Sequence, residues 1–209
     1  MFPLLIWRRS FHAALSCLMT WSLILVAAVP ASASDNLNAS WKAVPVSPYQ
    51  NYIRYWYHSS VPSSFKPRIF DGRQAWNNVG RELYFATGTS SDGLIKITYE
   101  DLLFPNGDAL AISMTYAGAC FPKICTGSIA YNSTPGSFTF YTGTGSPNGA
   151  NNEIDLWSVA AHEWGHQVSL THSSQSADTM WGTTNVGDTK QRTLTSHDIA
   201  GISALYPPK

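Results

Sequence analysis

The residues best suited to chemistry lie in one short segment, His162-Glu163-Trp164-Gly165-His166. Two histidines four positions apart on a helix project from the same face, one turn apart. Both imidazoles can therefore reach one Zn²⁺ ion at about 2.0–2.1 Å. Glu163, beside the first histidine, can contact a zinc-bound water rather than the metal, which is the placement that a general base needs. The segment predicts a site for metal-assisted hydrolysis.

A third histidine completes the set of candidate ligands. His172 follows His166 by six positions. Catalytic zinc typically has three protein ligands and a water, so two histidines alone would leave the ion under-ligated. We therefore expect the chain to turn back after Ser169 and to bring His172 to the metal.

The longer pattern carries a family resemblance. The sequence His162-Glu163-x-x-His166-x-x-Ser169-x-x-His172 resembles the zinc motif of the metzincin metallopeptidases. Downstream, Asp178-Thr179-Met180-Trp181 resembles their Met-turn, in which a methionine lies beneath the three imidazoles. The segment 194–206 is similar to the final helix of the matrixins, the matrix-metalloprotease-like branch. The resemblance implies structural support of the site by Met180, and by Asp198 as the anchor of the last helix to the Met-turn.

The resemblance also implies an activity. A secreted zinc-dependent endopeptidase would hydrolyse internal peptide bonds with one zinc, held by the three histidines, and with the zinc-bound water activated by Glu163. A protein or peptide substrate would lie in extended form along an edge strand, for which 127–132 is our candidate. The segment 181–192 would border the pocket for the side chain that follows the cut.

Two departures from the family pattern matter. Ser169 stands where the family has Gly, so we expect a serine in a left-handed backbone conformation, at a cost on the order of 1 kcal/mol. No Pro-Arg-Cys-Gly-like cysteine switch precedes the domain, and the activation step therefore has no candidate residue.

Other zinc sites are alternatives. A downstream Glu as third ligand, as in gluzincins, is excluded because Glu163 is the last Glu of the chain. An aspzincin-type peptidase would use one of the downstream aspartates, Asp178, Asp188 or Asp198. An exported zinc-containing binding module without proteolytic activity is a further alternative, although it would not require Glu163.

The elements that must position this site follow from hydrophobic spacing and breaker residues. The segment 67–79 has helical spacing and ends before Gly80. We expect Asn152 to cap a second helix, with Glu153 and Asp155 in its first turn and its end near Val168. A last helix is expected over 195–206. Short strands are expected at 51–57, 83–86, 94–99, 109–116, 128–131 and 138–141. This order predicts an α+β fold, a zincin-like single catalytic domain over 49–209 with a short-stranded mixed sheet, an active-site helix and a C-terminal helix.

The first 33 residues read as an export signal. Two arginines precede an apolar run over 13–29, and the small residues 31–33 follow it. This order is typical of a cleaved secretory signal, with a membrane anchor as the alternative. Residues 34–48 would then be a loose lead-in or a short propeptide. In an exported chain, Cys120 and Cys125 are expected to form a disulfide.

Composition excludes some classes of function. The 209 residues carry 13 Lys+Arg and 13 Asp+Glu, and without the signal 11 basic and 13 acidic residues remain. A nucleic-acid partner is disfavoured because there is no basic excess. Aromatic residues reach 13%, which excludes disorder over the whole length. We expect a monomer without a membrane partner after signal cleavage.

The loops 106–108 and 148–152 are candidates for Ca²⁺, although simple turns are the more common interpretation.

Overall fold

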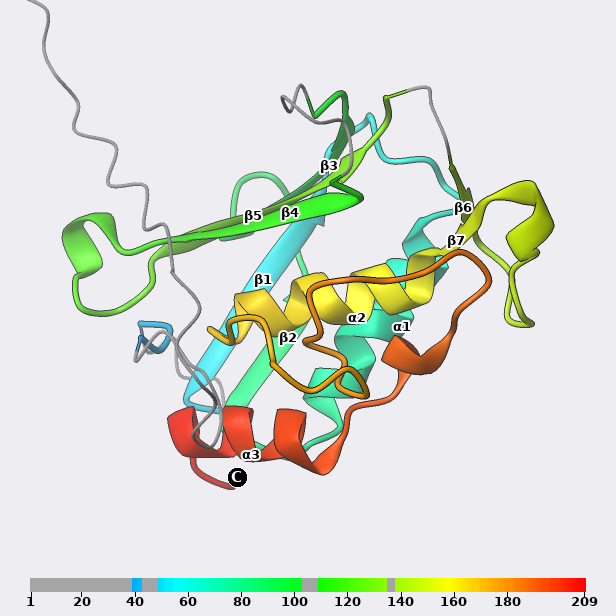
Figure 1. Ribbon diagram of the computed structural model, residues 1–209. Coiled ribbons are helices and arrows are strands. Elements are labelled where there is room, and N and C mark those ends of the chain that lie inside the picture. Colours follow the sequence, from blue (N-terminus) through cyan, green and yellow to red (C-terminus); the bar gives the residue numbers. More distant parts are fainter. Residues whose placement is uncertain (1–38, 43–48, 103–108, 135–137) are drawn as a thin grey trace, which may run out of the picture.

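A computed structural model describes residues 39–42, 49–102, 109–134 and 138–209 (Figure 1). The expected signal, 1–33, and most of the segment 34–48 lie outside these residues, as does the candidate calcium loop 106–108. Among the described residues, no helix combines the length and the apolar character that crossing a membrane requires.

A five-stranded mixed sheet forms one layer of the fold. Its spatial order is β2-β1-β3-β5-β4, in which β4 runs antiparallel to β5 and the other neighbours are parallel. A second small sheet pairs β6 with β7. The strands are β1 (Asn51–Tyr57), β2 (Leu83–Thr87), β3 (Ile95–Glu100), β4 (Ala111–Tyr116), β5 (Thr126–Asn132), β6 (Thr139–Tyr141) and β7 (Glu153–Asp155).

Two helices, α1 (Lys66–Asn77) and α2 (Leu156–Gln167), lie on the same side of this sheet, and α3 (Ser196–Leu205) lies beyond them (Figure 1). The two helices approach closely because Gly72 of α1 has no side chain. A Cβ atom at Gly72 would lie 2.5 Å from the main-chain nitrogen of Ala161 in α2. Three small residues, Gly72, Ala160 and Ala161, therefore bring the candidate zinc helix against α1.

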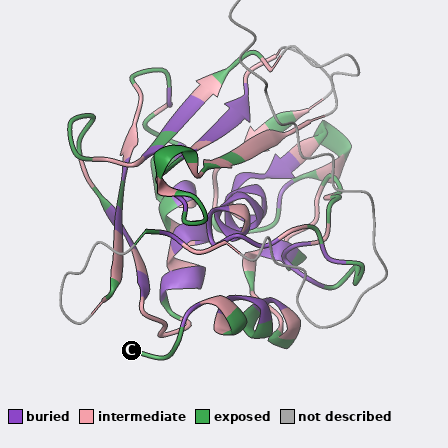
Figure 2. Cartoon of the chain, turned by 90° about the vertical axis from the view of Figure 1, so that its left-hand side faces the viewer, coloured by how far each residue is buried: buried purple, intermediate pink, exposed green. Residues whose placement is uncertain are grey.

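Buried residues gather on the inner strands and on α2 (Figure 2). Three tryptophans, Trp41, Trp76 and Trp164, are at most 1% exposed. Since a buried indole N–H needs an acceptor, each of them donates to a main-chain carbonyl, Trp41 to Gln167 at 2.7 Å and Trp76 to Ala161 at 2.8 Å. Residues 39–42 of the N-terminal segment thus pack onto the C-terminal end of α2.

The α+β fold with a mixed sheet, an active-site-like helix and a C-terminal helix is confirmed. The strand expected at 51–57 has those bounds, and the helix expected at 67–79 spans Lys66–Asn77. Cys120 and Cys125 form the expected disulfide, in the connection between β4 and β5.

The predicted start of the zinc helix is wrong. Asn152 does not cap α2; it has a left-handed conformation (φ 53°) at the end of a short 3₁₀ turn, η2 (Gly149–Asn151). The residues expected in the first helical turn instead form β7, which pairs with β6. The cap is Asp155, whose carboxylate accepts a hydrogen bond from Ser158 N at 2.9 Å. Strand pairing with β6, whose residues precede their β7 partners by 14 positions, overrides the local capping signal.

The end of α2 is a Schellman motif. The N–H of Ser169 donates to His166 O at 2.9 Å, and the N–H of Leu170 donates to Gly165 O at 3.1 Å. Ser169 takes the left-handed position of this motif, with φ 75°. The expected left-handed serine is therefore present, and the chain reverses after α2 toward His172.

The backbone at Ser169 supplies a stability test. Ser169→Gly and Ser169→Ala both remove the buried hydroxyl, so the difference between them isolates the backbone conformation. Because Gly adopts φ > 0 without a steric cost and Ala does not, the Gly variant should have the larger free energy of unfolding, by about 1 kcal/mol. Urea denaturation of zinc-free protein measures it, and an Ala variant as stable as the Gly variant would contradict the assignment.

Candidate metal centre

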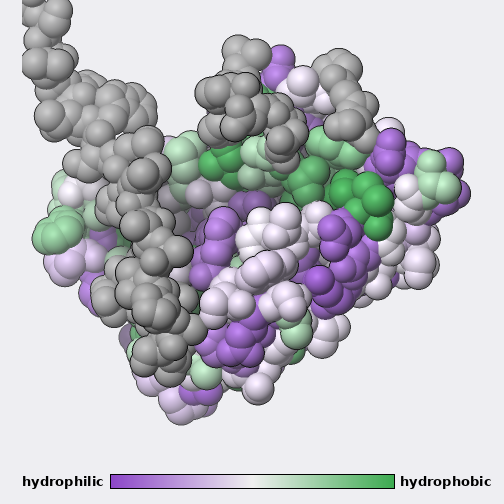
Figure 3. Space-filling model, in the orientation of Figure 1, coloured by the Kyte–Doolittle hydropathy of each residue, from purple (hydrophilic) through white to green (hydrophobic). Residues whose placement is uncertain are grey.

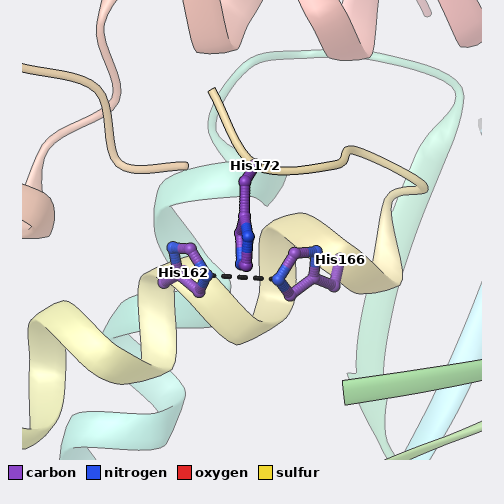
Figure 4. Close-up of side chains that lie close together, drawn as sticks. All are labelled: His162, His166 and His172. Atoms are coloured by element: carbon purple, nitrogen blue, oxygen red, sulfur yellow. Dashed lines mark hydrogen bonds between the residues drawn. The ribbon is translucent and has the colours of Figure 1, made fainter. Parts of the chain in front are cut away.

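Three imidazoles converge at the end of α2 (Figure 4). His162 and His166 project from one face of the helix, and His172 reaches between them from the loop that follows. Their nitrogen atoms lie within 4.8 Å of one another. The structure therefore brings together the three histidines that the sequence singled out.

Hydrogen bonds to the main chain fix the tautomers of two rings. His162 Nδ1 lies 2.8 Å from Thr179 O, and His166 Nδ1 lies 2.8 Å from Leu170 O. A carbonyl oxygen can only accept, so each Nδ1 carries the proton and each Nε2 presents a lone pair. The two Nε2 atoms are 3.1 Å apart.

Facing lone pairs at that distance repel each other unless a cation lies between them. Two nitrogens bound to one tetrahedral zinc at about 2.0–2.1 Å are about 3.3 Å apart. The donor set is therefore suited to Zn²⁺. Main-chain carbonyls behind the Nδ1 atoms are also the usual outer partners of zinc-binding imidazoles.

Burial keeps these rings in the form that binds metal. Desolvation, with a smaller contribution from neighbouring His166, lowers the pKa of His162 to about 3. Burial likewise lowers the pKa of His166 to about 4 and depresses the pKa of His172. All three rings are thus neutral near pH 7, and neutral imidazole is the metal ligand.

Glu163 lies beside the first histidine and is 5% exposed. Burial raises the pKa of its carboxyl to about 8. Within the described part of the chain, its Oε2 is a buried atom without a hydrogen-bond partner. An unpaired buried acceptor costs free energy, so it is suited to a group that arrives with the metal or the substrate.

Met180 lies against the zinc helix. It is 2% exposed, and a Cβ atom at Gly165 would lie 2.0 Å from its Sδ. Gly165, between the two histidines of α2, therefore leaves the space that the methionine occupies. Main-chain pairing of Ser173 N with Met180 O at 2.8 Å joins this turn to the segment that carries His172.

Asp198, in the first turn of α3, binds the same turn. Its carboxylate accepts hydrogen bonds from Thr179 N at 2.9 Å and from Met180 N at 3.2 Å. Thr179 O in turn accepts the hydrogen bond from the His162 ring. The Asp198 carboxylate is therefore connected to a candidate ligand through the main chain of Thr179.

The aspartates proposed as alternative ligands are bound to other groups. Asp178 is 1% exposed and accepts hydrogen bonds from Ser173, from Thr195 at 2.6 Å and from His197 at 2.7 Å. Asp188 pairs with Lys190 at 3.3 Å, and Asp198 holds the turn described above. The geometry therefore gives the aspzincin-type site no support.

Two buried amides near the site were missed by the sequence analysis. Gln191, 2% exposed, donates to Thr179 O at 3.2 Å and to Trp181 O at 2.7 Å. Gln167, fully buried, joins the end of α2 to the sheet. A neutral amide outside any motif has no sequence signal that distinguishes it from a surface residue. The position of Gln167 directly after His166 was the one available hint.

The predicted substrate edge is wrong. Residues 127–132 belong to β5, which lies between β3 and β4 and is not an edge. A hairpin-like return through the disulfide loop places β4 antiparallel along β5 and covers it. The sheet edge that α2 packs against is therefore β4.

Comparison with known proteins places this arrangement in a family. The sequence model for Matrixin matches residues 57–207. The chain is similar to Metalloendoproteinase 1-MMP of Arabidopsis thaliana, with 46% identity over 55 residues, 26% of this chain and 15% of that protein. It is 38% identical to human Matrix metalloproteinase-20 over 58 residues, 28% of this chain and 12% of that protein. It is 37% identical to rat (Rattus norvegicus) Matrilysin over 59 residues, 28% of this chain and 22% of that protein.

These matched segments span less than a quarter of each relative, whereas the family match covers most of this chain. The expected resemblance is thus confirmed at the level of the domain, and the chain belongs to the matrixin family.

Proposed function

We propose that the protein is a secreted zinc-dependent endopeptidase that hydrolyses internal peptide bonds of protein substrates. The observation that carries the proposal is the pair of Nε2 lone pairs 3.1 Å apart, with the buried carboxyl of Glu163 beside them. His162, His166 and His172 would hold the zinc. Family membership supports the same reaction class.

A bound zinc supplies a lowered pKa for water and a polarised scissile carbonyl. The remaining chemistry belongs to Glu163. Its Oε2 takes a proton from the attacking water and later delivers it to the nitrogen of the leaving amine. The carboxylate form accepts the proton in the first step, and the carboxylic acid so formed returns it in the second.

Substrate would lie in extended form along β4, which is the edge strand beside α2 in the described part of the sheet. On this face apolar residues gather over the β4 end of the sheet, and polar residues dominate the loops after α2 (Figure 3). Two β4 side chains are well exposed, Met114 at 45% and Tyr116 at 42%. The segment 181–192 would border the pocket for the side chain after the cut.

We propose an extracellular location, supported by the signal-like order of residues 1–33 and by the Cys120–Cys125 disulfide. Partners other than substrate are not needed for the proposed reaction, and a monomer without nucleic-acid or membrane partners suits the composition. One catalytic zinc is the cofactor. The candidate Ca²⁺ loop 148–152 contains a turn in which Asn148 accepts from Ala150 N at 3.0 Å; calcium stays a prediction.

Replacing the general base tests the reaction. Glu163→Gln should retain stoichiometric zinc and lower kcat on casein by about 10²–10⁴-fold or more, because the amide cannot accept the proton. Zinc content and casein hydrolysis are measured on the same preparation, with and without a chelator. Glu82→Gln, outside the site, is the matched control. A fully active Glu163→Gln protein would contradict the mechanism, and an inactive, zinc-loaded wild type would favour the binding module.

Removing the exposed histidine tests the ligand set. His172→Ala should lose zinc on dialysis against a weak chelator under conditions in which wild type keeps it, because two imidazoles bind zinc poorly. Metal content is read by atomic absorption. His58→Ala, whose ring contacts Ser60, is the control. Unchanged zinc in His172→Ala, together with loss in Asp178→Asn, would identify the aspartate as the third ligand.

A further inference from the structure

Gln167 is the last residue of α2 and directly follows His166. Its side chain is fully buried, at 0% exposure, between the helix and the sheet. Its main-chain carbonyl accepts the Trp41 indole N–H at 2.7 Å. Neither the side chain nor this carbonyl takes part in the proposed proton transfers.

The Gln167 amide clamps two strands. The two N–H groups of its Nε2 are shared among three acceptors, Ser113 Oγ at 2.6 Å and Met114 O at 3.1 Å on β4, and Ser128 O at 3.1 Å on β5. Met114 and Ser128 are partners in the strand register. One amide group thus holds the edge strand and its neighbour at the same step of the ladder.

The surroundings are shaped around this amide. A Cβ atom at Gly127 would lie 2.2 Å from Gln167 Oε1, so the absence of a side chain there admits the carboxamide. Among the described residues, that Oε1 has no hydrogen-bond partner. Since an unpaired buried oxygen costs free energy, a methionine would fill the space at lower cost if packing were the only role. The presence of glutamine at this position therefore points to a role for its N–H donors.

We propose that Gln167 is a positioning residue that sets the placement of the substrate-binding edge, β4, relative to the metal ligands of α2. This role rests on the proposed peptidase function. Among the described strands β4 pairs with β5 alone, and the Gln167 amide joins β4 to α2 one residue from His166. A substrate strand paired with β4 would therefore have its scissile carbonyl positioned relative to His162 and His166 through this amide.

The role predicts a particular kinetic effect. Without the clamp, β4 still offers the same edge groups for pairing, so peptide affinity is retained. The scissile bond is misplaced, and misplacement by about 1 Å can lower the rate about 10²-fold. The loss should therefore appear in kcat rather than in KM.

Gln167→Met tests this, since it keeps the volume and removes the donors. On an extended peptide substrate, kcat should fall at least about tenfold while KM stays within about twofold. Zinc should remain stoichiometric, and affinity for acetohydroxamate, a small zinc chelator that does not reach β4, should be unchanged. Amide hydrogen exchange of 111–116 should accelerate. Gln74→Met, on α1, is the matched control.

Gly127→Ala is the second variant, and it serves also if Gln167→Met does not fold. Its methyl group displaces the Gln167 carboxamide, so the same loss in kcat is expected. In a Gln167→Ala background the clash at 2.2 Å is gone and a contact with Met114 O at 3.2 Å remains, so Gly127→Ala should then cost much less further activity than it does in wild type. Such non-additivity is the signature of a direct contact.

Several results would overturn the role. They are an unchanged kcat in Gln167→Met, a parallel loss of zinc or of acetohydroxamate affinity, and additive effects of the two substitutions. Failure of the proposed function looks different: zinc-loaded wild type would then not cleave the peptide at all, and the role would fall with it. If wild type is active and Gln167→Met shows faster hydrogen exchange in β4 but a normal kcat, the positioning role is overturned and the proposed peptidase function stands.

Discussion

The structure depends on one constraint, the orientation of two imidazoles whose Nε2 lone pairs meet at 3.1 Å. Helical spacing puts His162 and His166 on one face, but spacing does not set the rotation of the rings. Main-chain carbonyls set it, Thr179 O for the first ring and Leu170 O for the second. Both carbonyls come from chain that follows the helix. The geometry of the centre is therefore decided as much by the backbone after α2 as by the helix itself.

That backbone course is held by side chains from further along the sequence. The left-handed Ser169 reverses the chain, so that Leu170 O can face back to the helix. Asp198 of α3 fixes the Thr179 N–H, and Gln191 binds the Thr179 carbonyl from the other direction. A carboxylate that accepts several main-chain hydrogen bonds is a strong local anchor. The C-terminal helix thus contributes to the metal centre without contacting the metal.

Local chemistry made most elements and the histidine set predictable. The histidines share one helix and a short turn, so their convergence needs little more than 3.6-residue periodicity and a reversal at Ser169. Predictions failed where long-range pairing decides. Asn152 satisfies the local rules for a cap, yet pairing of β6 with β7 moves the cap to Asp155. The choice of β5 as the edge failed for the same reason, because no local feature of residues 127–132 tells which strand lies beside them.

Side-chain interactions fix α2 at both ends. Such ties matter because α2 carries two of the three candidate metal ligands. At its start, the buried carboxylate of Asp155 forms a two-point ion pair with Arg192, at 2.6 and 2.8 Å, besides capping the helix. Arg192 also donates to the carbonyls of Thr144 and Gly145 at 2.7 Å. A buried charge is tolerated only when it is paired in this way, so the pair resists separation. At its end, Gln167 joins the helix to the sheet. A helix that could slide would carry both imidazoles away from His172 together, and ties at the two ends prevent that motion.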